Sequence, residues 1–295
     1  MRILLYHGVR PSDDKVSPDI RKKHIPEAIF RKQIEYFARS YQPMSLSDVI
    51  DVLRDNRPLP RRGLCVTFDD GYENNATTAA PILKQYGVPA AFFVTTGFID
   101  GTTRLWVDRF ETAFSQLPKT GETDDDVRSR LKRLTPQERD AQIEELERLA
   151  GTTHVVHPLY RPMTWDHIRS LANDGFEIGA HTVTHPVLTH CSTDEARREI
   201  RDSKQRIEDE LRTPCRHFAY PNGQPGDWND AVKRIVRDMG FISCLTTIDG
   251  PTKNGDDVFE LKRTTIDTGD DFVKFRLTVS GLRSTIHKLR SAIRV

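Results

Sequence analysis

The sequence predicts an α/β fold built on a mostly parallel sheet. Short apolar runs alternate with longer segments of helical periodicity, and glycines follow several of the helical segments. The length of 295 residues allows one large α/β domain or two small ones. Because we find no internal repeat and no low-complexity linker, we expect one domain over residues 1–295.

The N-terminal third contains three apolar runs that predict strands, separated by segments with apolar residues at helical spacing. Pro26 is expected to open the first helix, and Gly87 to follow the third one as its C′ residue. In chain order, the expected elements are a strand 3–6, a helix from residue 26, a short helix after Ser45 or Ser47, a strand 64–68, a helix 75–86 and a strand 90–95.

Residues 101–160 interrupt this alternation. The segment is charged, and the sequence from Thr135 to Glu138 has the capping-box pattern of a helix start, with proline at N1. We interpret about 101–160 as a helical insertion with a turn near 119–126. A small lid subdomain is the alternative, and the sequence leaves both open.

The alternation resumes after residue 160. Ser192 and Glu195 form a capping-box pattern before a long helix, and Asp227 is expected to be the N-cap of the next one. In chain order, the expected elements are a helix 164–174, a strand 176–180, a helix 193–212, a strand 217–220, a helix 227–239, a strand 241–245 and a tail of two helices over about 269–295, joined near 280–281.

Composition excludes several classes of protein. With 44 basic and 43 acidic residues, the net charge of +1 argues against nucleic acid or an anionic membrane as the main partner. No stretch approaches the ~20 apolar residues of a transmembrane helix, and the N-terminus lacks the pattern of a signal peptide. We therefore expect a cytoplasmic location, with association to a membrane left open. The cysteines, which form no C-x-x-C pair, are expected to be small buried side chains: Cys65, Cys191, Cys215 and Cys244.

The first candidate site lies where a predicted buried strand ends in Asp69 and Asp70, followed by Gly71. Active sites of α/β proteins gather at the C-terminal ends of strands, where adjacent side chains can point in different directions. One aspartate can therefore bind a metal while the other faces the substrate. A turn with a helix N-cap is the alternative, because Asp-Gly is common in turns.

A second predicted strand ends in two histidines four residues apart, His181 and His185. Imidazole is the commonest neutral metal ligand, and this spacing lets two rings converge on one ion. Two histidines and one aspartate leave a coordination position for water, as in catalytic metal sites. This donor set suits one divalent metal, Zn²⁺ above all, although Co²⁺, Ni²⁺ or Fe²⁺ fit the same ligands.

Together, T-F-D-D-G-Y at 67–72 and H-T-V-T-H-P at 181–186 resemble the first two motifs of the polysaccharide deacetylase family, carbohydrate esterase family 4. The resemblance covers roughly residues 1–100 and 160–270, and it implies a single deformed (β/α) barrel of about seven strands. It also implies that Asp69 is the general base and that Asp70, His181 and His185 bind the metal. Such a metal polarises the acetamide carbonyl and lowers the pKa of bound water from 15.7 toward about 7.

The run F-A-Y-P-N-G at 218–223 resembles the family's third motif, an Arg-x-Pro-Tyr-Gly pattern. By this resemblance, the backbone N–H of Asn222, which follows Pro221, would donate to the oxyanion. Ala219 stands where the motif has the arginine that orients the base, and Arg263 is the candidate for the missing cation. A simple turn is the alternative for Pro-Asn-Gly.

The family usually protonates the leaving amine with a histidine from a late L-x-H motif. His287 is a late candidate, but it lies in a basic helical tail. His7, in L-L-Y-H-G-V at 4–9, resembles the relocated motif of the branch that acts on exported poly-N-acetylglucosamine, in which the motif order is circularly permuted. We therefore favour His7 as the general acid, with a structural strand-end histidine as the alternative.

Aromatic side chains are candidates for stacking on a sugar ring. Trp106, Trp165 and Trp228 are possible stacking residues, although the last two are equally consistent with a place in the core. Tyr72, after the aspartate pair, and Pro221 are expected to line the groove for the substrate.

The sequence therefore predicts metal-dependent removal of an N-acetyl group from a sugar of a surface polysaccharide or its precursor, with release of acetate. Since no export signal is visible, a lipid-linked or nucleotide-linked sugar is the expected form of the substrate. A catalytically silent glycan-binding module on the same fold and a hydrolase of a non-sugar amide are the alternatives.

Overall fold

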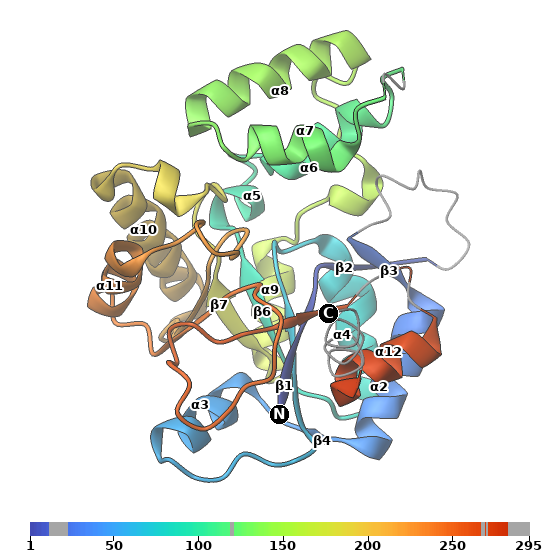
Figure 1. Ribbon diagram of the computed structural model, residues 1–295, viewed down its shortest axis with the longest axis vertical. Coiled ribbons are helices and arrows are strands. Elements are labelled where there is room, and N and C mark those ends of the chain that lie inside the picture. The colour runs from blue at the N-terminus through green and yellow to red at the C-terminus, as the bar shows by residue number, and fades with distance from the viewer. Residues whose placement is uncertain (12–22, 119–120, 267–268, 270, 283–295) are drawn as a thin grey trace, which may run out of the picture.

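The computed structural model is a curled parallel sheet surrounded by helices, which confirms the expected deformed barrel as an open half-barrel (Figure 1). It describes residues 1–11, 23–118, 121–266, 269 and 271–282. The strands of the main path lie in the order β10-β1-β5-β6-β7-β8-β9, and β4 pairs with β5 beside it. Their bounds are β1 Arg2–Tyr6, β4 Gln42–Pro43, β5 Gly63–Phe68, β6 Ala90–Val94, β7 Glu177–Ala180, β8 His217–Ala219, β9 Ser243–Leu245 and β10 Thr264–Thr265. A separate parallel pair is formed by β2 Gly8–Arg10 and β3 His24–Pro26.

Helices cover the sheet as the alternation predicted. A π-helical turn at Asn75–Ala79 leads into α4, so the single helix expected over 75–86 has two parts. The helices around the barrel are α2 Glu27–Ser40, α3 Leu46–Arg54, α4 Ala80–Gln85, α5 Thr96–Ile99, α9 Trp165–Asn173, α10 Thr193–Leu211, α11 Asp230–Asp238 and α12 Phe272–Ser280. No helix in the described part of the chain is both long and apolar enough to span a membrane.

The expected N-cap of α11 is wrong. Asn229 caps this helix by accepting from the amide of Val232. Asp227 instead accepts from the amide of Gln224 at 2.8 Å and from Lys132 at 2.7 Å. Its carboxylate therefore closes the preceding loop and ties it to the helical insertion.

Both faces of the central strands are buried, which explains why these strands appear as continuous apolar runs. Successive side chains point to opposite faces. Leu4, Val66 and Phe92 pack under the surrounding helices, whereas Cys65 and Phe93 fill the inside of the barrel. The four cysteines are free and are buried or partly buried, as expected.

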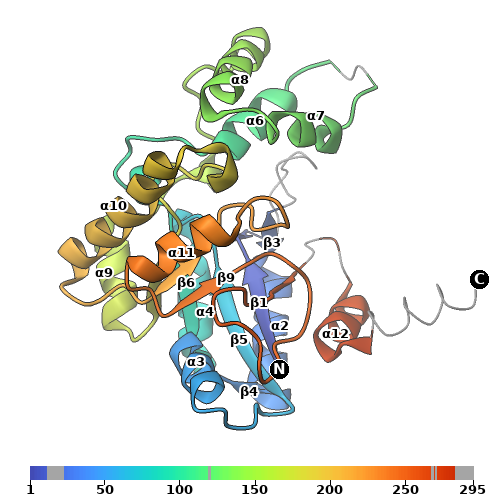
Figure 2. The same ribbon diagram turned by 60° about the vertical axis from the view of Figure 1, so that its left-hand side comes forward.

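The insertion contributes three helices, α6 Trp106–Phe114, α7 Asp124–Leu131 and α8 Pro136–Ala150, which lie together at one end of the molecule (Figures 1 and 2). In Figure 1, β1 runs from the N-terminus toward β2, so the C-terminal ends of the parallel strands face these helices. Tyr72 and Phe98 from the barrel pack with Trp106, Phe110 and Tyr160 in one buried cluster. A single domain with an insertion remains our interpretation of this arrangement.

Candidate active site

The ends of two strands bring the predicted metal ligands together. Asp70 follows β5 and His181 follows β7, on either side of β6, and His185 returns to the same place through a short turn. Asp70 Oδ1 lies 3.6 Å from His181 Nε2 and 3.5 Å from His185 Nε2. One ligand atom from each of these buried residues lies within 4.8 Å of the others, a spacing that one metal ion can bridge.

Hydrogen bonding and charge around the three residues suit a metal. His181 Nδ1 lies 2.8 Å from the carbonyl oxygen of Ala219, which can only accept, so Nδ1 carries a proton and Nε2 is the ring nitrogen that faces Asp70. Burial lowers the pKa of His185 to about 3 despite the opposing charge of Asp70, and the charge of Arg139 contributes a smaller part. Burial alone would raise the pKa of Asp70. The charges of the neighbouring histidines and of Lys23 outweigh burial and bring this pKa below its ordinary value, so the carboxylate is ionised. The residues present therefore fit a divalent cation.

The backbone around these ligands is held in an uncommon conformation. Asp70, Thr182, His185 and Asn222 have φ angles of 76°, 66°, 60° and 62°. Non-glycine residues rarely adopt this left-handed region, and such residues cluster at functional sites. The surrounding structure must therefore supply the interactions that hold the ligand turns in place.

Glu199 on α10 supplies part of that support. Its carboxylate accepts from the backbone amides of Val183 and Thr184 at 2.8 and 2.9 Å, and from the hydroxyl of Thr184 at 2.8 Å. Within the turn, the amide of His185 donates to the hydroxyl of Thr182 at 3.0 Å. These bonds hold the turn that presents both histidines.

Asp69, the predicted base, is paired with Arg263. Two guanidinium nitrogens of Arg263 donate to the two carboxylate oxygens at 2.7 and 2.6 Å, and a third donates to the carbonyl of Thr246 at 2.8 Å. Burial raises the pKa of Asp69, but Arg263 and His181 bring it below its ordinary value. Arg263 immediately precedes β10. A cation from a distant part of the chain therefore pairs with Asp69, as the arginine expected at position 219 would.

His7 directly follows β1 and Asp69 directly follows the neighbouring β5, and the two residues lie at the same level because Tyr6 pairs with Phe68. Burial lowers the pKa of His7, and the charges of Asp70 and Asp69 oppose that effect. The predicted acid therefore lies close enough to both aspartates for their charges to raise its pKa.

Asn222 lies in a turn after β8. Its backbone amide donates to no group in the described part of the chain, and its own carbonyl accepts from the hydroxyl of Thr247. The side chain of Pro221 is buried. The turn therefore leaves one backbone donor available beside the barrel.

The aromatic candidates are placed less favourably for binding a sugar. Tyr72 is fully buried and donates to Asp108, so the expectation that it lines an open groove is wrong. Trp165 donates to Asp100 and lies under the guanidinium of Arg206. Trp228 stacks on Tyr220 at 4.9 Å between ring centroids.

The other acid candidate, His287, lies outside the described residues.

Sequence reasoning missed two groups near the site. Glu199 follows His185 by 14 positions on a charged helix, and its capping of the turn has no local signature. Lys23 forms ion pairs with Asp108 and Glu111, and its charge also lowers the pKa of Asp70. Only the packing of the insertion on the barrel brings Lys23 to its two partners on α6.

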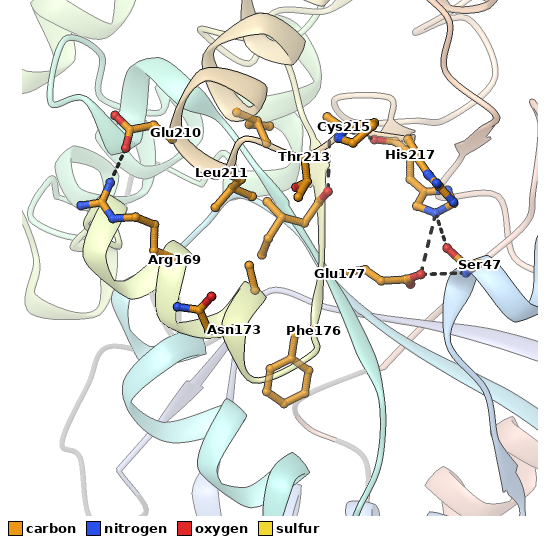
Figure 3. Close-up of a pocket in the computed structure, with 15 residues that line it drawn as sticks. Ser47, Arg169, Asn173, Phe176, Glu177, Glu210, Leu211, Thr213, Cys215 and His217 are labelled. Carbon is orange, nitrogen blue, oxygen red and sulfur yellow. Dashed lines mark hydrogen bonds and ion pairs between the residues drawn. The ribbon is translucent and has the colours of Figure 1, made fainter.

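A pocket of about 360 Å³ lies at the opposite edge of the sheet (Figure 3). Glu177 and His217 begin β7 and β8, whereas the metal ligands follow strand ends. Glu177 accepts from the backbone amides of Leu46 and Ser47, and Ser47 Oγ lies 3.1 Å from His217 Nε2. We interpret these contacts as support for the start of α3.

Comparisons with known proteins identify the family of this chain. A family model described as polysaccharide deacetylase matches residues 56–243. The YxkH protein of Bacillus subtilis (strain 168), which carries the same family name, is 18% identical over 268 residues, covering 90% of this chain and 71% of the relative. The poly-beta-1,6-N-acetyl-D-glucosamine N-deacetylase of Escherichia coli (strain K12) is 30% identical over 83 residues, which are 28% of this chain and 12% of that protein.

Solved structures share the fold. The Streptococcus pyogenes deacetylase PplD in complex with acetate has a TM-score of 0.67 at 20% identity, over 95% of this chain and 97% of that one. IcaB from Ammonifex degensii has a TM-score of 0.65 at 19% identity, over 95% and 96%. At these identities, the likeness concerns the fold alone.

Proposed function

The chain belongs to the polysaccharide deacetylase family, and we propose that it is a metal-dependent hydrolase that removes the acetyl group from an N-acetylated sugar. One observation carries this proposal. Three metal-ligating atoms converge beside a carboxylate that is ionised and held by an arginine, so a metal site and a base lie next to each other.

Asp70, His181 and His185 would hold the cation, and Zn²⁺ is our first choice, with Co²⁺, Ni²⁺ or Fe²⁺ as other ions that the same ligands accept. When bound, the cation would supply Lewis acidity toward the acetyl carbonyl and the attacking water. All other steps of the proposed reaction belong to side chains and backbone groups of this chain.

Asp69 would accept a proton from the water as the water oxygen attacks the carbonyl carbon. Arg263 would keep that carboxylate ionised and oriented, and the amide of Asn222 would donate to the oxyanion. His7 would give a proton to the nitrogen as the C–N bond breaks, so that acetate and a free amine leave. Because burial lowers the pKa of His7, its protonated fraction and the rate should fall as the pH rises through that value.

The substrate is proposed at the level of an N-acetylated sugar in a surface polysaccharide or in its lipid-linked or nucleotide-linked precursor. The names of the Escherichia coli and Staphylococcus epidermidis relatives support a polymer of N-acetylglucosamine, although these matches cover 28% and 34% of this chain. The cytoplasmic location stays a prediction, which cell fractionation tests.

The test is incubation of metal-loaded protein with a panel of N-acetylated oligosaccharides, nucleotide sugars and cyclic amides, followed by mass spectrometry. We expect a loss of one acetyl group from at least one sugar, and no loss with Asp69→Asn. Metal binding without acetate release from any sugar would contradict the proposal and favour a silent glycan-binding module. Hydrolysis restricted to the cyclic amides would instead identify a non-sugar amidase.

A further inference from the structure

A cavity of about 770 Å³ lies between the helical insertion and the turn that carries the metal-ligating histidines. Trp106 at the start of α6 and Arg139 on α8 line it from the insertion, and Thr184 lines it from the turn. Because Thr184 stands between His181 and His185, the cavity reaches the edge of the proposed metal site.

Three buried donors around this cavity have no partner. Arg139 is 3% exposed and Trp106 is 2% exposed. Nε and Nη1 of Arg139 and Nε1 of Trp106 bond to no group in the described part of the chain. The guanidinium carbon lies 4.8 Å from the centroid of the Trp106 ring. Since buried polar groups in folded proteins almost always have partners, this arrangement points to an acceptor that the chain itself does not provide.

Arg139 also lacks an ion-pair partner among the described residues, although the charge of the neighbouring Asp140 acts on it. The other arginines that line the cavity are paired: Arg104 and Arg109 with Glu147, and Arg148 with Glu145. Arg139 forms no ion pair with any residue that the structure describes. A buried cation with free donors favours an anionic partner over a neutral one, because a charge-assisted hydrogen bond is stronger than a neutral one.

We propose that this cavity binds an anionic group of the substrate, a carboxylate or a phosphate attached close to the acetylated sugar. The planar fork of Arg139 matches the two oxygens of either group, and the indole N–H of Trp106 adds a third donor. The inference rests on the proposed function, since it deepens the choice of substrate at the same site. It selects acidic glycans or phosphate-linked sugars over neutral polymers.

The test measures binding to metal-free protein by calorimetry, so that it does not depend on turnover. The first pair of probes is N-acetylglucosamine 1-phosphate against N-acetylglucosamine. The second pair is an N-acetylated disaccharide that contains glucuronate against the same disaccharide with the carboxylate reduced to an alcohol. In at least one pair we expect the anionic probe to bind about tenfold more tightly. The pair that responds identifies the anion as phosphate or carboxylate.

Arg139→Gln should abolish that preference, and Arg139→Lys should retain only part of it, because lysine keeps the charge but loses the fork. The matched control is Arg148→Gln, which changes an arginine of the same cavity whose side chain is 67% exposed, and which should keep the full preference. Equal binding within both pairs by the wild-type protein would overturn the proposal, as would a preference that survives in Arg139→Gln.

Acetate release is measured separately with metal-loaded protein. A preference for the anionic probes without acetate release would leave the anion site standing and refute the proposed function. Acetate release with no preference in either pair would support the proposed function and refute the anion site.

Discussion

Replacing Arg263 with methionine should lower the free energy of unfolding at pH 7 by about 3–5 kcal/mol, because it leaves a buried carboxylate without its cation. Two guanidinium nitrogens bond to the carboxylate of Asp69 at 2.7 and 2.6 Å, and the two side chains are 0% and 3% exposed. Methionine fills much of the same space without donors or charge. The loss therefore reports on the ion pair more than on packing.

The sign of the pH dependence follows from the pKa of Asp69. In the wild-type protein this pKa lies below its ordinary value, so the stability from the pair is present above about pH 4 and is lost as the pH falls through the lowered pKa. In Arg263→Met, burial would raise the pKa of Asp69, so ionisation of the carboxylate would oppose folding as the pH rises. The difference in stability between the two proteins should therefore be largest near pH 7 and shrink toward pH 4.

Urea unfolding at pH 7, 6 and 5, with EDTA present to remove bound metal, measures this difference. The control is Arg201→Met, since the side chain of Arg201 is 54% exposed and pairs with its exposed neighbour Asp202. We expect this control to change stability by less than about 1 kcal/mol. In a double-mutant cycle, adding Asp69→Asn to Arg263→Met should recover part of the loss. A difference below about 1 kcal/mol at pH 7, or one that is the same at every pH, would refute the reasoning.

Three further predictions concern the metal and its surroundings. Asp70→Ala should abolish binding of the metal measured by calorimetry, whereas Asp69→Asn should bind it normally and lose acetate release; normal metal binding by Asp70→Ala would remove this residue from the ligand set. His7→Ala should keep the metal and lower kcat by roughly 10²–10⁴-fold, and unchanged kcat would return the acid role to another group or to water. Glu199→Gln should weaken the affinity for the metal by about 10–100-fold, with Asp202→Asn on the same helix as the control. Equal affinities of Glu199→Gln and the wild-type protein would show that the turn does not need the hydrogen bonds from Glu199.

The convergence of the proposed metal ligands could be predicted from the sequence because each residue stands next to a strong local pattern. Asp69 and Asp70 follow a continuous apolar strand, and His181 and His185 follow another. In a parallel sheet, the C-terminal ends of the strands meet at one edge, so recognising the strands was enough to bring these side chains together. The parallel sheet was predicted from its apolar central strands, whereas its curling into a barrel was implied by the resemblance to the family.

Contacts across long stretches of sequence could not be predicted in the same way. The hydrogen bonds between Arg263 and Asp69 span 194 positions of the sequence. Arg263 precedes a strand of two threonines, which is too short and too polar to be predicted from an apolar run. The N-cap at Asn229 was missed because Asp227 has the same capping chemistry, and only the loop geometry decides between them. Tyr72 was misplaced because the sequence does not reveal that the insertion covers it.

The position of the arginine shows what the proposed base requires of the fold. Ala219 occupies the place of the third-motif arginine, and it is buried inside the barrel in the same cluster as Phe93. Arg263 lies between a bridge to β9 at Leu261 and the start of β10, and its guanidinium lies near the ring of Phe93 and bonds to Asp69. A buried carboxylate stays ionised when a cation lies at hydrogen-bonding distance and the cation's remaining donors also have partners. The segment of the chain that carries this cation does not matter. Because side chains from all segments of a barrel share its interior, the same electrostatic requirement can be met from a segment other than the one that carries Ala219.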